Sequence, residues 1–352
     1  MSDHKNIIAR VEGHAGVIEL DRPKALNSLT PDMIAGITQA VSKWESDDSI
    51  EVVIIRSTAE RAFCAGGDVR GVRETDMEGN YQPGDDFFRD EYALNLQLAE
   101  YNKPIVALME GVCMGGGFGI SAHGSHRVIT PRTLGAMPEA AIGFVPDVGM
   151  SHALTHLDVD PAIGLFIGCT GWRLSPADML FTGLGNVLVD DANALAEQLP
   201  TQSLREALQA ARIDQSELDE PQSVLEKHQK WIVDTFAVGS WVDIERRIAE
   251  SDEVNGDVNA EDHAKFLRAV RESLETANPS SLVAIVEVFR RSAQTDLATA
   301  LKNELAVGGH LRREGNFAEG VRAVLVDKDR TARFDPARAE DVDPKTYSEL
   351  LS

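Results

Sequence analysis

Two glycine clusters are the first places in this sequence where backbone groups could do chemistry. Ala65-Gly66-Gly67-Asp68 comes after the apolar run Val52–Arg56, and Gly115–Gly119 comes after the apolar run Ile105–Met109. Glycine leaves its peptide N–H uncovered, so a ligand oxygen can approach it closely. A helix expected to start at Ile120-Ser121-Ala122 would add a positive dipole end. Together the loops predict a pair of hydrogen-bond donors, although a tight turn better explains the first cluster taken alone.

Two carboxylates, Glu139 and Asp147, lie eight residues apart in an apolar stretch. Gly143 and Pro146 lie between them, which argues against one continuous helix and predicts a bent loop from which both acids project. Apolar neighbours such as Phe144 would raise the pKa of a carboxylate, which suits a nucleophile or a general base. For an isolated pair of acids, a surface Glu139 and a helix-capping Asp147 are the simpler interpretation.

Other residues with catalytic potential give weaker patterns. Residues 117–122 fit the G-x-G-x-x-A form of a dinucleotide fingerprint, but they lie far beyond the first βα turn where that fingerprint belongs. His152 and His156 have no third ligand at a recognised spacing, so we expect no metal site. Cys64 has no adjacent basic group that would lower the pKa of its thiol, so we expect it to pack in the core.

The composition limits the class of protein. The chain has 352 residues, enough for about two domains of roughly 150 residues each. Its 34 Lys and Arg against 57 Asp and Glu give a net charge of −23, which repels nucleic acid. The three cysteines lie far apart, which excludes a disulfide framework and a Cys-rich zinc site.

The start of the sequence holds no apolar run long enough for a signal peptide. Nowhere do about eighteen apolar residues run together, as a membrane-spanning helix would require. We therefore expect a cytoplasmic protein that binds neither nucleic acid nor a membrane.

The elements that must position these groups differ along the chain. The first 145 residues alternate β-rich runs with helical patterns, which indicates an α/β or related layered architecture. Ile7–Val11 and Val17–Leu20 are expected to form a hairpin, and Thr30 to cap a helix that runs to about Trp44. From about Ser203 the pattern becomes helical, with helices expected over Leu204–Ile213, Val224–Phe236, Val242–Ala249, Ala260–Thr276 and Asn278–Arg291. Between Gly71 and Asp86 the acidic, glycine-containing composition predicts a mobile surface loop that could serve as a lid.

The order of the motifs resembles the crotonase superfamily, which has the enoyl-CoA hydratase/isomerase fold. The similar segments are Leu20–Leu29, Phe63–Asp68, Gly111–Gly119 and Pro138-Glu139. Three more segments are similar to the 3-hydroxyisobutyryl-CoA hydrolases of that superfamily: Phe87–Tyr92, Pro138–Gly149 and Glu319–Asp329. The resemblance implies an α/β (α+β) fold, a crotonase-like spiral of ββα units followed by C-terminal helices. It also implies a CoA-thioester-binding catalytic core over residues 1–202 and a helical region over 203–352.

The resemblance assigns roles to individual residues. In that family two backbone N–H groups bind the thioester oxygen, and they correspond here to Gly67 and Gly116. Hydratases of the superfamily use two glutamates, but the first corresponds to Gly119, so only Glu139 remains, joined by Asp147. Loss of one acid undermines hydration of a double bond, whereas hydrolysis needs less. We expect Glu139 to attack the thioester or to activate a water, and Asp147 to bind the substrate's 3-hydroxyl or to assist proton transfer.

Further positions are implied to contact the substrate. Glu91 matches a substrate-facing acid of the family. The adenine end of CoA is expected near Lys24, Ala25, Leu26, Ala65 and Asp68, with Lys24, Arg70 or Arg73 near the phosphates. Coenzyme A is part of the substrate, so no separate cofactor and no metal are expected.

The implied activity is hydrolysis of a short-chain 3-hydroxyacyl-CoA, most consistent with 3-hydroxyisobutyryl-CoA in valine breakdown. Met150-Ser151-His152 departs from the further glycines of the family, which leaves the acyl group open. An enoyl-CoA hydratase or isomerase is the first alternative, and a non-catalytic CoA-binding member of the fold is the second. Superfamily members often form trimers and hexamers, so the resemblance also admits a homo-oligomer.

Overall fold

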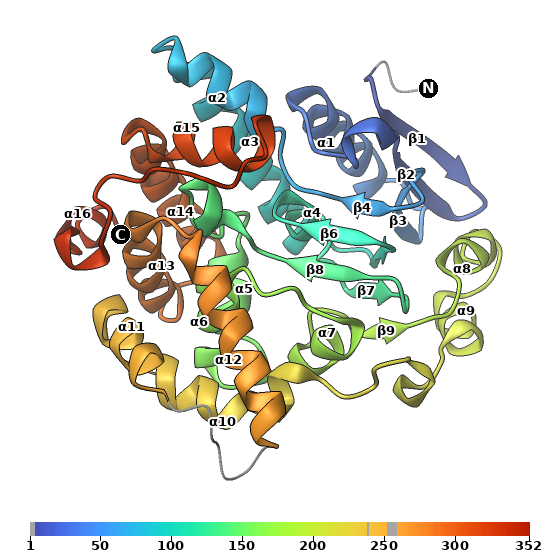
Figure 1. Ribbon diagram of the computed structural model, residues 1–352. Coiled ribbons are helices and arrows are strands. Elements are labelled where there is room, and N and C mark those ends of the chain that lie inside the picture. Colours follow the sequence, from blue (N-terminus) through green and yellow to red (C-terminus); the bar gives the residue numbers. More distant parts are fainter. Residues whose placement is uncertain (1–3, 238, 252–258) are drawn as a thin grey trace. The chain divides into compact units, whose positions relative to one another are not determined.

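The computed structural model describes residues 4–237, 239–251 and 259–352 (Figure 1). The chain forms two compact units, each made of segments that are distant in the sequence. Unit 1 consists of Met1–Asp68, Asp86–Gly135 and Arg173–Ser223. Unit 2 consists of Val69–Asp85, Ala136–Trp172 and Val224–Ser352. The domain boundary expected at residue 202 stays a prediction.

Unit 1 is built on a six-stranded sheet with the strand order β1-β2-β3-β5-β7-β9. The first two strands are antiparallel, which confirms the predicted hairpin, and every following pair is parallel. The strands are β1 (Ile7–Glu12), β2 (Ala15–Leu20), β3 (Val52–Ser57), β5 (Ile105–Met109), β7 (His126–Ile129) and β9 (Val187–Leu188). Parallel strands are covered on both faces, and this explains the continuous apolar runs in β3 and β5.

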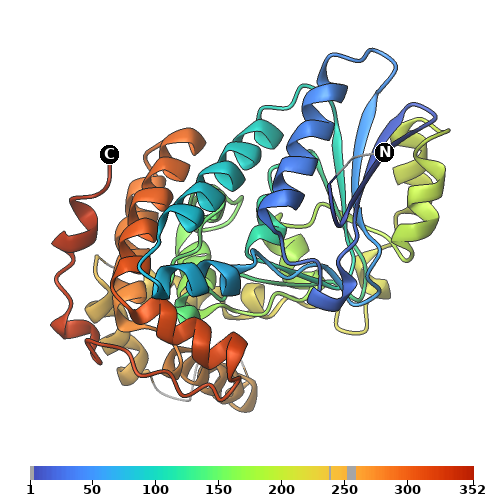
Figure 2. The same cartoon turned by 90° about the horizontal axis from the view of Figure 1, so that it is seen from above.

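Helices cover both faces of this sheet. Val52 and Ile54 pack toward α8 (Ala192–Gln198) and α9 (Leu204–Ala211), while the alternate residues of β3 face the other way. On that other side lies α1 (Pro31–Glu45), which contacts β1 and β2. Figure 2 shows α1 in blue on one side of the strands and α8 and α9 in yellow-green on the other. Thr30 caps α1 by accepting a hydrogen bond from the Met33 N–H, which confirms the predicted helix start.

A second sheet of three strands, β4-β6-β8, leads directly into the glycine clusters (Figure 1). These strands are β4 (Ala62–Cys64), β6 (Val112–Met114) and β8 (Leu134–Ala136). Because β4 and β6 are parallel, their carboxyl ends lie at the same edge, and both glycine loops begin there. The short helix α4 (Gly116–Gly119) consists of the glycines themselves. The expectation that a helix starts only at Ile120 is therefore wrong.

The remaining elements of unit 1 are short or peripheral to the sheets. They are the 3-10 helix η1 (Pro23–Ala25), most of α3 (Gln82–Ala99), α7 (Pro176–Thr182) and η3 (Gln215–Glu217).

Unit 2 is helical, and the helices expected over residues 224–236, 242–249, 260–276 and 278–291 are confirmed to within one or two residues. Its elements are α2 (Val69–Met77), η2 (Glu139–Ile142), α5 (Met150–Thr155), α6 (Pro161–Thr170), α10 (Val224–Phe236), α11 (Trp241–Glu250), α12 (Ala260–Glu275), α13 (Pro279–Ser292), α14 (Leu297–Arg313), α15 (Asn316–Val321), η4 (Arg322–Val326), η5 (Ala339–Asp341) and α16 (Lys345–Ser348). Within the described ranges, no helix combines the length and the apolar character needed to cross a bilayer.

The expectation of a mobile loop between Gly71 and Asp86 is wrong, because most of this segment is helical. It belongs to α2 and to the first turn of α3. The buried guanidinium of Arg312 pairs with Asp76 at 2.6 Å and with Asp85 at 2.8 Å. Two of the acids that suggested a solvated loop are thus paired with a cation from α14, at sequence separations of 236 and 227 residues.

Candidate functional site

Gly67 and Gly116, here called the glycine pair, lie against each other in unit 1. Gly66 and Gly115 precede them with φ angles of 108° and 48°, conformations that other residues rarely adopt. Leu29 donates its N–H to the Gly66 oxygen, and its own carbonyl accepts from the N–H of Asp68. In the described part of the chain, neither N–H of the glycine pair donates to a protein acceptor. Both donors are therefore available to a ligand.

Helix α3 closes one side of the glycine pair. A Cβ atom built on Gly116 would lie 3.2 Å from the Gly67 nitrogen and 2.5 Å from Oε1 of Glu91. A Cβ built on Gly67 would lie 3.9 Å from Oε2 of Glu91 and 3.1 Å from the Phe87 ring. Phe87 and Glu91 are one turn apart on α3, and both are buried. Any side chain at 116 would therefore displace the Glu91 carboxylate.

The segments expected to bind CoA are joined within unit 1. Lys24 and Ala25 lie in η1, and Leu26 follows it with its carbonyl accepting from the N–H of Ala65 at 3.0 Å. Arg22 donates to the Asp68 carboxylate at 2.8 Å. These two bonds join the segment 22–26 to the first glycine loop within unit 1. The contact of both segments with CoA stays a prediction.

Two of the predicted phosphate-binding cations belong to a different unit. Arg70 and Arg73 lie in α2 of unit 2, whereas Lys24 lies in unit 1. The Arg73 Nε donates to the carbonyl of Ala318 at 2.7 Å. Arg22 was not predicted from the sequence as a contact, but it bonds directly to Asp68, which was. Arg22 belongs to the segment Leu20–Leu29 that resembles the crotonase superfamily, so the sequence did contain a signal for it.

Glu139 and Asp147 lie in unit 2, in a segment that we call the carboxylate loop (residues 139–150). The predicted bent loop is confirmed, because η2 ends at Ile142 and no helix resumes until Met150. Both carboxylates are buried, at 7% and 6% exposure, so the interpretation of Glu139 as a surface residue is wrong. Gly149 occupies the N-cap of α5 with no side-chain cap, so Asp147 is not the cap either.

The C-terminal helices brace the first half of the carboxylate loop. The N–H of Asn278, which caps α13, donates to the carbonyl of Ala140 at 2.8 Å. A Cβ on Gly143 would lie 2.6 Å from the backbone of Asn316, and one on Gly320 would lie 2.4 Å from the backbone of Ile142. α15 therefore packs against this loop with backbone on backbone, which leaves no room for side chains at these glycines.

The second half of the loop contacts Glu304 on α14, a residue that the sequence analysis missed. Its carboxyl group accepts from the N–H of Gly149 at 2.7 Å and from the N–H of Ser151 at 3.0 Å. Burial raises the pKa of Glu304 to about 8, against the opposing effect of these hydrogen bonds. No motif marks Glu304, since it is one polar residue among others on an amphipathic helix.

The other candidates have structural explanations. All three cysteines are buried and free, and burial raises the pKa of each thiol, to about 12 for Cys113, so their predicted packing role is confirmed. The rings of His152 and His156 stack at 4.0 Å. Among the described residues, no three side chains of His, Cys, Asp or Glu group as a metal site would require.

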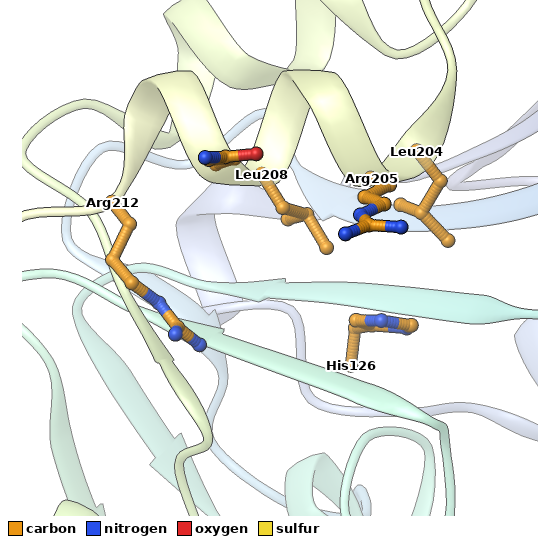
Figure 3. Close-up of a pocket in the computed structure, with 6 residues that line it drawn as sticks. His126, Leu204, Arg205, Leu208 and Arg212 are labelled. Carbon is orange, nitrogen blue, oxygen red and sulfur yellow. The ribbon is translucent and has the colours of Figure 1, made fainter.

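A cavity of about 470 Å³ lies under α9 in unit 1, beside the start of β7 (Figure 3). Its lining consists of His126, Leu204, Arg205, Leu208, Gln209 and Arg212. The two arginines are exposed, and Arg212 already donates to the carbonyl of Asn186 at 3.1 Å. None of the predicted site residues lines this cavity, and it is separate from the glycine pair.

The comparisons with known proteins agree with this architecture. Residues 15–351 match the family model described as enoyl-CoA hydratase/isomerase. The chain therefore belongs to the enoyl-CoA hydratase/isomerase family, the crotonase family, as the sequence motifs predicted. Among curated relatives, the mitochondrial 3-hydroxyisobutyryl-CoA hydrolase of Danio rerio is 36% identical over 348 residues, 97% of this chain and 87% of that protein. The enzyme of the same name from Gallus gallus is 34% identical over 345 residues, 96% of this chain and 86% of that protein.

Solved structures confirm the predicted fold class. An enoyl-CoA hydratase from Rhodobacter sphaeroides superposes with a TM-score of 0.86 at 33% identity, and the match covers 99% of this chain and 97% of that one. A carnitinyl-CoA dehydratase from Mycobacterium thermoresistibile gives a TM-score of 0.88 at 30% identity, over 99% of this chain and 96% of that one. The crotonase fold therefore extends over nearly the whole chain.

Proposed function

We propose that this protein hydrolyses the thioester of a short-chain 3-hydroxyacyl-CoA, with 3-hydroxyisobutyryl-CoA as the preferred substrate and 3-hydroxyisobutyrate and CoA as products. The relatives from Danio rerio and Gallus gallus support the reaction class, since proteins of that name match almost the full length of this chain. The structural observation that supports hydrolysis over hydration is the identity of the residue at position 119. α4 ends there in a buried glycine, so the carboxylate that a hydratase needs is missing.

The proposed chemistry requires one pair of donors and one carboxylate. Glu139 adds to the thioester carbon, or it takes a proton from a water molecule that adds to that carbon. In either case negative charge develops on the carbonyl oxygen, and the N–H groups of Gly67 and Gly116 stabilise it by about 3 kcal/mol each. The C–S bond then breaks, and CoA leaves as a thiolate that takes up a proton. If Glu139 is the nucleophile, the acid is released when water hydrolyses the mixed anhydride.

The remaining predicted residues orient the substrate in this proposal. Asp147 accepts a hydrogen bond from the 3-hydroxyl group or assists proton transfer. Glu91, which lies against the glycine pair, faces the acyl group. Lys24, Leu26 and Asp68 belong to the two joined segments that contact CoA. Assembly into a homo-oligomer, a cytoplasmic location and a place in valine breakdown stay predictions from the sequence.

A hydratase or dehydratase is the second candidate, because both solved structures described above have such titles. It would have to supply a proton to the α-carbon without an acid at Gly119. A non-catalytic CoA-binding protein is the third candidate, and the buried pair of Glu139 and Asp147 argues against it. Burial of a carboxylate costs free energy, and two buried acids in one loop fit a catalytic role better than a passive binding role.

Release of free CoA separates the three candidates. Purified protein is incubated with 3-hydroxyisobutyryl-CoA, 3-hydroxypropionyl-CoA and crotonyl-CoA, a thiol reagent detects CoA, and absorbance of the conjugated double bond detects hydration. We expect thiol release from the first substrate, slower release from the second, and no hydration of the third. Hydration of crotonyl-CoA without thiol release contradicts the proposal in favour of a hydratase. No turnover of any substrate, with binding of CoA retained, contradicts it in favour of a binding protein.

A further inference from the structure

The turn that presents Asp147 has an unusual backbone. The N–H of Met150 donates to the Asp147 carbonyl at 2.8 Å, which closes a four-residue turn. Its two central residues, Val148 and Gly149, have φ angles of 53° and 81°. Glycine adopts such angles freely, but a β-branched residue does so only under constraint from its surroundings. Val148 is 1% exposed, so its side chain is also fixed.

Glu304 supplies that constraint from outside the turn. Its Oε2 accepts from the Gly149 N–H, and its Oε1 accepts from the Ser151 N–H and from the Ser151 hydroxyl at 2.5 Å. The N–H groups of three consecutive residues are thereby fixed. The middle one belongs to Met150 and donates to the Asp147 carbonyl, and the two on either side donate to Glu304. The turn has no freedom to rotate about Val148 while these bonds persist.

The network continues into a second helix. The Ser151 hydroxyl lies 2.8 Å from the hydroxyl of Ser292, the last residue of α13. Glu304, Ser151 and Ser292 are all fully buried. A buried network of polar groups favours one conformation of the chain when every member has a partner, because an alternative arrangement leaves one member unpaired.

We infer that Glu304 is a positioning residue for the reaction: it holds the Asp147–Met150 turn in its left-handed conformation and so fixes the direction of the Asp147 carboxylate. This inference rests on the proposed function, since it gives Glu304 an effect only through Asp147. Glu304 also adds little second charge beside that acid. Burial and the negative charge of Asp147 both raise its pKa, to about 8, so it is mostly protonated at neutral pH.

Kinetics of two variants test the inference. Glu304→Gln keeps the size of the side chain, but its amide nitrogen is a donor, so one of the two N–H groups loses its acceptor. We expect kcat/KM to fall about tenfold or more. Ser151→Ala keeps both N–H groups bonded and should lose no more than about threefold. Glu245→Gln, the same substitution at an exposed acid on α11, is the control and should leave both kcat and KM unchanged.

A double-mutant cycle shows whether Glu304 acts through Asp147. In an Asp147→Asn background, we expect Glu304→Gln to change kcat/KM by less than about twofold. An equal loss in both backgrounds, or no loss in either, overturns the inference. Far-UV circular dichroism and the unfolding temperature confirm that each variant is folded.

A crystal structure tests the conformation of the turn directly, whatever the substrate is. If the wild-type protein releases no CoA, the proposed function fails, and the turn is examined directly in wild type and Glu304→Gln crystallised under the same conditions. We expect Val148 to leave the left-handed region in the variant. An unchanged Val148 and an unmoved Asp147 carboxylate overturn the inference independently of the activity.

Discussion

The glycine pair and the carboxylate loop are held in place in opposite ways. In unit 1 the donors are positioned by backbone, since the strands β4 and β6 run in parallel and Gly66 and Gly115 turn the chain directly after them. In unit 2 the acids are positioned by residues far along the chain, because Asn278, Asn316 and Glu304 support the loop from three different helices. A backbone donor needs only the correct turn, whereas a carboxylate needs a prepared environment.

The largest expected effect comes from the carboxylate loop. Glu139→Gln keeps the shape and removes the charge, so kcat should fall at least about a hundredfold with KM nearly unchanged, as for an essential base or nucleophile. Steady-state thiol release with 3-hydroxyisobutyryl-CoA measures it. Glu245→Gln, an exposed acid on α11, is the matched control and should behave as wild type. Activity of Glu139→Gln within a few-fold of wild type would remove Glu139 from the mechanism and with it the contrast between the two regions.

A smaller effect is expected at the glycine pair. In Gly116→Ala the new Cβ lies 2.5 Å from Oε1 of Glu91, so the Glu91 carboxylate or the Gly116 N–H must move. We expect kcat/KM to fall about tenfold to a hundredfold, near the lower range for loss of one oxyanion donor. Gly71→Ala is the control, because nothing lies within 4 Å of a Cβ there. Equal activity of the two variants would show that the pair tolerates side chains.

The predicted site residues of unit 1 were the more accessible to sequence analysis. Ala65–Asp68 and Gly115–Gly119 follow recognisable buried strands, and pairing of those strands brings the loops together. The extent of the helix was not predictable, since glycine is a poor helix former and α4 is made of it. The link between Arg22 and Asp68 also needed the structure, because it joins residues 46 positions apart.

The last expected effect is on stability rather than on rate, and it concerns Glu304. Its pKa is raised from 4.5 to about 8, so between these pH values the native state keeps a proton that the unfolded chain releases. Unfolding free energy therefore declines as the pH rises through this window, by at most about 1.4 kcal/mol per pH unit from this group. Urea unfolding at pH 5, 6, 7 and 8 measures it, with Glu304→Gln as the comparison. If the difference between wild type and variant does not decline with pH, Glu304 is not protonated in the folded protein.

The predicted site residues of unit 2 show what sequence analysis could not reach. The bend between Glu139 and Asp147 was predictable because Gly143 and Pro146 interrupt any helix. The burial of Glu139 was not, since it depends on how helices from the C-terminal part pack. The prediction for the segment at 71–86 failed for the same reason: Asp76 and Asp85 are paired with Arg312, and no local pattern shows a partner so far along the chain.

The bond between Ser151 and Glu304 spans 153 residues, and this has a consequence for how the protein is made. The ribosome completes the strands and glycines of the donor loops early, in the first third of synthesis. The turn at Val148 can settle only once α14 has emerged, when most of the polypeptide is already outside. We therefore expect a nascent chain to become hydrolytically competent late, and a product released before Leu297 to remain without activity.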